Sequence, residues 1–113
     1  MKIVDLLLLQ EFRDKDRCEW CRKYTRTGLD PHHVYCRGLG GAFRLDIRIN
    51  MVSLCRQCHV SAHTSCEPCQ ADLLAVIAKR ESMTVDAVER EIFRLKSLTK
   101  EGKHPNELRR RKP

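Results

Sequence analysis

The chain has 113 residues, the size of one ordinary domain, and only 5% of them are aromatic, which excludes a core built from packed rings. Lysine and arginine total 22 against 15 acidic residues, and a net charge of +7 favours a polyanion such as nucleic acid as partner, although some soluble domains are basic without binding one. Seven cysteines cannot all pair as disulfides within one chain, and Cys-x-x-Cys spacing favours metal-bound thiolates in a reducing compartment.

Residues 1–17 are expected to form an exposed lead-in. Their apolar run within residues 3–9 is too short to span a bilayer. No small-residue cleavage site follows it, so no signal peptide is expected. We therefore expect a cytoplasmic protein with no membrane partner.

Residues 18–65 contain five of the seven cysteines and four of the five histidines. Three glycines in the middle of this region predict a loop or a tight turn: Gly38, Gly40 and Gly41. The segments 33–36 and 43–45 on either side are expected to be short strands.

Two helices are expected in the C-terminal half, over residues 70–80 and 84–97, because apolar side chains recur there at three- and four-residue steps. Thr84 is a candidate N-cap of the second helix. We expect a helical hairpin, within an extension over residues 66–102, that covers the rest of the domain rather than reading DNA. Residues 103–113 form a basic tail, expected to be solvated or to contact phosphate.

Two Cys-x-x-Cys pairs predict a structural zinc site with four thiolate ligands: Cys18 and Cys21, Cys55 and Cys58. A tight turn brings both sulfurs of such a pair to one point, about 2.3 Å from a zinc ion. Four thiolates leave no open position for a substrate, so the site would be structural. Cys66 and Cys69 have the same spacing and are an alternative ligand pair. If they are not ligands, we expect them and Cys36 to be buried small apolar residues or a weak accessory site.

Four histidines surround the second cysteine pair in sequence. His59 follows Cys58 directly, and His63 comes four residues later, so a helix beginning here would place both imidazoles on one face. His32 and His33 are adjacent on an expected strand and would point to opposite sides of it. One of them can then face a metal while the other faces a water molecule.

The order His-His, Asn, His, combined with two cysteine pairs, resembles the HNH endonucleases, also called ββα-metal or His-Me finger nucleases. Here it is Pro31-His32-His33-Val34, then Asn50, then Cys55-Arg56-Gln57-Cys58-His59. The resemblance covers residues 18–63 and is to the small four-cysteine zinc type found in phages and bacteria. It implies an α+β fold, with a small ββα-metal core, a structural zinc site and a C-terminal helical extension.

The resemblance also implies a function, hydrolysis of DNA phosphodiester bonds with a divalent metal. His33 matches the general base that deprotonates the attacking water, and imidazole suits this role because it titrates near neutral pH. Asn50 matches the residue that braces the loop and orients the base. His32, His59 and His63 match ligands of the catalytic metal.

The metal at the active site is expected to be Mg²⁺, Mn²⁺, Ni²⁺ or Zn²⁺, of which imidazole ligands suit Mg²⁺ least. Asp30 stands two residues before His32, where many family members carry an acidic residue, so an all-histidine ligand set has an alternative. The expected partner is double-stranded DNA bound with weak sequence specificity, and a homodimer is left open. Candidate phosphate contacts are Arg37, Arg44 and Arg48.

Two other functions compete with the nuclease. A zinc-stabilised nucleic-acid-binding module without catalysis would account for the charge and the cysteines, but it leaves His33, Asn50 and His59 unexplained. A protein–protein adaptor would use the helical hairpin as its contact surface.

Overall fold

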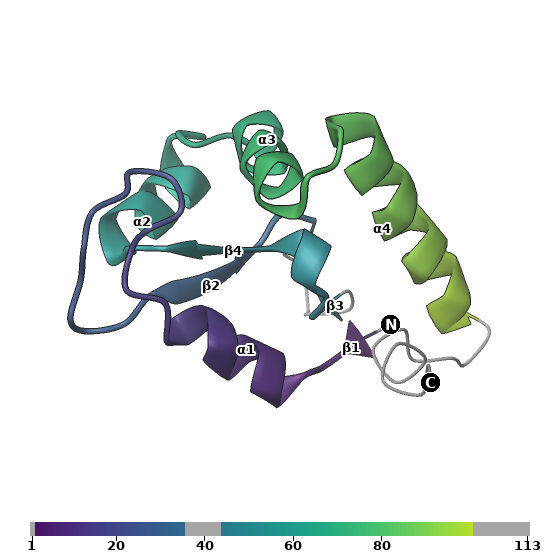
Figure 1. The fold of residues 1–113 in the computed structure, drawn as a ribbon, viewed down its shortest axis with the longest axis horizontal. Helices are drawn as coiled ribbons and strands as arrows, with labels where there is room; N and C mark the ends of the chain where they lie inside the picture. The colour runs from purple at the N-terminus through teal and green to yellow at the C-terminus, as the bar shows by residue number, and fades with distance from the viewer. Residues whose placement is uncertain (1, 36–43, 101–113) are drawn as a thin grey trace.

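A two-stranded antiparallel sheet lies at the centre of the structure, a computed structural model that describes residues 2–35 and 44–100 (Figure 1). Strand β2 (Asp30–His33) pairs with strand β4 (Met51–Leu54). Every residue of β4 is buried, so this strand crosses the interior of the domain. Helix α2 (Arg56–Thr64) begins two residues after β4 ends, and it contacts both strands.

The N-terminal segment is part of the fold, which corrects the expectation of an exposed lead-in. Strand β1 (Lys2–Ile3) pairs in parallel with strand β3 (Arg44–Leu45), and helix α1 (Leu6–Arg13) packs against the central sheet on the side opposite to α3 (Figure 1). The Asp5 side chain caps α1 by accepting a hydrogen bond from the backbone N–H of Leu8. The inward-facing side chains are buried: Ile3, Leu9 and Phe12.

The strand expected over residues 33–36 lies three residues earlier. The N–H of Val34 still bonds to the carbonyl of Asn50, but the N–H of Tyr35 bonds to the Asn50 side chain, so the backbone pairing ends there. Asn50 ends a short 3-10 helix, η1 (Arg48–Asn50), that precedes β4. Of the other expected strand, residues 44 and 45 form β3. Outside the described residues lie Cys36, Arg37, the three glycines, Phe43 and residues 103–113.

The two helices expected in the C-terminal half are confirmed. Helix α3 (Gln70–Glu81) and helix α4 (Val85–Lys100) pack against each other, α3 covers β4, and both contact η1. The hydroxyl of Thr84 accepts a hydrogen bond from the N–H of Ala87 at 3.1 Å, as an N-cap does. None of the helices in the described part of the chain has the length and apolar character needed to cross a membrane. Four apolar side chains of the hairpin are buried in the core, with 0–1% of their surface exposed: Leu73, Ile77, Val88 and Ile92.

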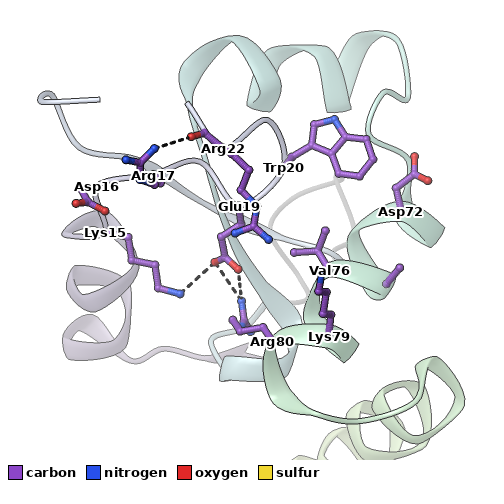
Figure 2. Close-up of a pocket in the computed structure, with 11 residues that line it drawn as sticks. Lys15, Asp16, Arg17, Glu19, Trp20, Arg22, Asp72, Val76, Lys79 and Arg80 are labelled. Carbon is purple, nitrogen blue, oxygen red and sulfur yellow. Dashed lines mark hydrogen bonds and ion pairs between the residues drawn. The ribbon is translucent and has the colours of Figure 1, made fainter. Parts of the chain in front are cut away.

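A buried ion pair ties α3 to the loop that follows α1. Arg80 donates to both carboxylate oxygens of Glu19, at 3.1 and 2.9 Å, and Lys15 approaches the same carboxylate at 3.1 Å (Figure 2). Although burial raises the pKa of Glu19, Arg80, the N–H of Ser53 and Lys15 together lower it below its usual value. Arg80 also lies over the ring of Phe12, 5.3 Å from its centroid. Because Glu19 lies between Cys18 and Cys21, these contacts hold the first cysteine pair in place against the sheet.

Candidate metal centres

The two cysteine pairs meet in space, one from the loop after α1 and the other from the start of α2. All four sulfurs lie within 4.8 Å of one another, and those of Cys21 and Cys55 are 3.9 Å apart. Tetrahedral zinc with bonds of about 2.3 Å would separate its sulfur ligands by about 3.8 Å. Each pair is closed by a backbone N–H that points at the first sulfur, at 3.5 Å from Cys21 to Cys18 and from Cys58 to Cys55. The four cysteines can therefore hold a zinc ion.

The pKa values of these thiols are compatible with a bound cation at the cluster. Although burial raises the pKa of Cys18, backbone N–H groups directed at its sulfur lower it to about 7. Burial and the neighbouring sulfurs raise the pKa values of Cys21 and Cys58. Without a cation, one thiolate thus opposes the ionisation of the others. A bound divalent ion would remove this conflict, since it stabilises every thiolate at once.

The third cysteine pair is not part of this cluster. Cys66 is exposed, with a left-handed backbone φ of 52°. Cys69 is half-buried at the N-cap of α3, where its sulfur lies 3.2 Å from a carboxylate oxygen of Asp72. Neither is fully buried, so the expectation of buried apolar residues is wrong for this pair, while the other expectation, a weak accessory site, stays a prediction. Among the described side chains, neither belongs to a group of three or more metal-ligating residues.

Three histidines form a second cluster beside the first. The ring nitrogens of His32, His59 and His63 lie within 4.8 Å of one another, and the Nε2 atoms of His59 and His63 are 3.2 Å apart. Two nitrogens on a tetrahedral ion, at bonds of 2.0–2.1 Å, would be separated by about 3.3 Å. The i, i+4 spacing on α2 brings His59 and His63 together, and β2 supplies His32. The cluster is compatible with a metal ion.

The protonation and orientation of these imidazoles favour ligation. Burial, with the neighbouring imidazoles, lowers the pKa of His32 to about 4, so its ring is neutral at neutral pH. The Nδ1 of His59 lies 2.9 Å from a carboxylate oxygen of Asp30, which in turn pairs with Arg56 at 3.3 Å. A carboxylate on one ring nitrogen orients a histidine and leaves the other nitrogen for a metal. Asp30 thus contacts the ring of His59 and is not one of the three clustered groups.

His33 faces away from this cluster, as strand alternation predicts. Its Nε2 lies 2.7 Å from Oδ1 of Asp46, a side chain with no exposed surface. Burial raises the pKa of Asp46, but hydrogen bonds from His33, Arg44 and the N–H of Asp5 outweigh it and lower that pKa to about 2. An ionised carboxylate only accepts hydrogen bonds, so Nε2 of His33 carries the proton and Nδ1 is the basic nitrogen. The His33 side chain is 20% exposed, so water can reach it.

Sequence reasoning missed Asp46. The sequence shows only that Asp46 is an acidic residue between two apolar ones, Leu45 and Ile47. In the structure both neighbours are fully buried. An acid within an apolar run requires charge-assisted hydrogen bonds when it is buried. Its partners, however, come from separate parts of the chain.

Asn50 holds both ends of the segment that links β2 to β3. Its side-chain oxygen accepts from the N–H of Tyr35 at 2.8 Å, and its Nδ2 donates to the carbonyls of Tyr35 and Leu45, each at 3.1 Å. It is completely buried, so removing its side chain would leave these backbone groups unpaired. These contacts are compatible with bracing of the loop, and the role that the resemblance implies for Asn50 stays a prediction. In the described part of the chain, the side chain that contacts His33 is Asp46 rather than Asn50.

The two described arginines among the candidate phosphate contacts are bound to acids of the same chain. Arg44 donates twice to Asp46, at 3.0 and 2.9 Å. Arg48 bonds to Glu81 and to Glu11. Each keeps 37% of its side chain exposed, so phosphate contacts by these two residues, and by Arg37, stay predictions.

Helix α2 connects the two clusters. Its first turn carries Cys58, and the next residue, His59, belongs to the histidines. No protein-family model matches the chain, and neither a curated protein nor a solved structure is significantly similar to it. The function is therefore inferred from the chemistry of the two clusters.

Proposed function

We propose that the chain is a metal-dependent endonuclease of the HNH type, with a ββα-metal core made of β2, β4 and α2. One observation carries this proposal: adjacent residues of β2 present one imidazole to a three-histidine cluster and the next, His33, to a buried carboxylate. A site that only bound a metal would leave the pair of His33 and Asp46 without a role. The four cysteines would hold a structural zinc beside it.

The chain's own residues then have distinct roles. His32, His59 and His63 would hold a divalent metal, which when bound polarises the scissile phosphate and stabilises the leaving oxygen. The Nδ1 of His33 takes a proton from the attacking water. Asp46 keeps the proton on Nε2 and stabilises the imidazolium that forms, as the carboxylate of a catalytic triad does.

The substrate that we propose is double-stranded DNA, cut with weak sequence specificity. The net charge of +7 favours a polyanion as substrate. Helices α3 and α4 bury their apolar faces within the domain, so we assign them the role of covering the core rather than of reading a DNA sequence. Phosphate contacts by Arg37, Arg44 and Arg48, and a homodimer that makes double-strand breaks, are parts of the same proposal.

Nicking of supercoiled plasmid tests the proposed activity. We expect cleavage with Mn²⁺, Ni²⁺, Zn²⁺ or Mg²⁺ and none without added divalent metal. His63→Ala removes an exposed ligand, so it should weaken binding of this metal and lower cleavage by at least the roughly 10- to 100-fold that loss of a residue supporting a ligand costs. Gln57→Ala, at an exposed position of the same helix, is the matched control and should cut normally. DNA binding that weakens with salt, with no cutting in any metal, would instead identify a zinc-stabilised binding module.

Asp46 is a positioning residue in this mechanism. Asp46→Asn keeps the shape of the side chain and an acceptor for the N–H of Asp5, but it no longer holds the proton on Nε2 of His33. We expect kcat to fall on the order of 100-fold, with KM almost unchanged, because orientation of the base matters in the transition state only. Kinetics of plasmid nicking measure both constants. A folded variant with normal kcat would show that Asp46 is structural only.

A further inference from the structure

A cavity of about 750 Å³ lies between the first cysteine loop and α3, with the Glu19–Arg80 ion pair in its lining (Figure 2). Trp20, inside the Cys18–Cys21 loop, stands on one wall, and Val76 of α3 on another. The indole keeps 40% of its surface exposed, a large share for the largest apolar side chain in the chain. Exposed aromatic rings of this kind are used as platforms for flat ligands.

The charges around the cavity are unequal. Five cationic and three acidic side chains line it, and the central acid, Glu19, is already bonded to Lys15 and Arg80. Asp72 accepts from the N–H of Cys69 at the N-cap of α3. Three exposed cations have no acidic partner among the described residues: Arg17, Arg22 and Lys79. Arg17 donates to the carbonyl of Arg22, and the side chain of Arg22 runs into the cavity (Figure 2). The cavity therefore offers cations that are free to bind an anion beside the ring.

We propose that this cavity binds one nucleotide of a single-stranded polynucleotide, with its base stacked on Trp20 and its phosphates on Arg22 and Lys79. A simple anion would make no use of the indole, and an apolar ligand would make no use of the cations. A base within a duplex is stacked on its neighbours, so only an unpaired base can reach the ring. The volume is in the range of small-ligand sites and is sufficient for one nucleotide.

The chain contains a single tryptophan, so its intrinsic fluorescence reports on this cavity directly. We expect an oligothymidylate to quench it, in buffer without added divalent metal, while a blunt duplex of the same length and thymidine monophosphate do so far less. The log of the affinity should fall with the log of salt concentration, by about 0.7 for each phosphate neutralised. Replacing Trp20 by Leu should lower the affinity for a labelled oligothymidylate on the order of tenfold, read by anisotropy.

Charge-neutralising variants make the test independent of the tryptophan. Arg22→Gln and Lys79→Gln should each weaken binding and reduce the salt slope by about 0.7. Arg90→Gln makes the same charge change at an exposed position of α4 outside the cavity. It should leave both the affinity and the salt slope unchanged. Zinc content and melting temperature, measured on every variant, identify any that has lost its fold.

Three results would overturn the proposal: no quenching by the oligothymidylate, equal quenching by duplex or by the mononucleotide, or an equal effect of Arg90→Gln and Lys79→Gln. The outcome is separable from that of the nuclease. Quenching without plasmid nicking would support the single-strand site and reject the nuclease proposal. Nicking without quenching would support the nuclease and reject the single-strand site.

Discussion

Replacement of Cys21, one of the four clustered cysteines that could hold zinc, is expected to abolish cooperative folding. Structural zinc contributes on the order of 10–16 kcal/mol in small zinc peptides, and a whole domain is stable by about 5–15 kcal/mol. Helix α2 shows why the dependence should be strong here. None of its residues is fully buried, so zinc held by Cys55 and Cys58 at its start would add much to the contacts that Ala62 makes with the core and His59 with Asp30. Without zinc we expect α2 to detach, together with His59 and His63.

The substitution Cys21→Ser tests this with little change in packing, since the side chain is exposed. Cys66→Ser is the matched control, because Cys66 is also exposed and lies outside the cluster. Zinc content and thermal unfolding followed by circular dichroism are the measurements. We expect Cys21→Ser to lose both zinc and its unfolding transition, and Cys66→Ser to keep both. Equal melting temperatures for the two variants would mean that the four sulfurs do not hold a stabilising ion.

His33→Ala should lower the rate of DNA cleavage about 10²- to 10⁴-fold, the contribution of a general base. The fold should survive, because the side chain is partly exposed and Asp46 keeps hydrogen bonds from Arg44 and from the N–H of Asp5. Metal binding at the histidine cluster should also survive, since His33 points away from it. Single-turnover nicking of plasmid at saturating metal measures the loss.

The comparison with His63→Ala separates the base from the metal ligands. Loss of cleavage in His63→Ala should be accompanied by weaker metal binding, measured by calorimetry, whereas His33→Ala should bind the metal as the wild type does. Undiminished cutting by a folded His33→Ala protein would reject its assignment as the base and with it the mechanism proposed here.

Spacing along the chain was enough to predict the local parts of both clusters. A Cys-x-x-Cys turn brings its two sulfurs together wherever it lies, and histidines four residues apart share a helix face. Adjacent residues on a strand point to opposite sides, so His32 and His33 had to separate. The helical hairpin was equally predictable, because its apolar periodicity is long and regular.

The expectation of an exposed N-terminal lead-in was wrong because the helix within residues 1–17 leaves only a short pattern in the sequence. Helix α1 has only eight residues, and the charged residues from its last residue, Arg13, onward gave the segment a solvated character. Only Leu9 and Phe12 of that helix are buried, too few for a periodic pattern to be recognised. The strand expected over residues 33–36 was misplaced because its partner, β4, is preceded by a 3-10 helix over residues 48–50, far along the chain, which ends the pairing after His33.

The sequence by itself determined which residue types could form a thiolate cluster and an imidazole cluster, because these depend on spacings of three and four residues. Only the tertiary structure decided which cysteine pair completes the first cluster, since Cys69 caps α3 while Cys55 caps α2 beside the first loop. The tertiary structure also decided which side chain bonds to His33. Asp46 reaches His33 because β1 pairs with β3 and the N–H of Asp46 bonds to Ile3, and such contacts between distant segments leave no periodic trace in a sequence.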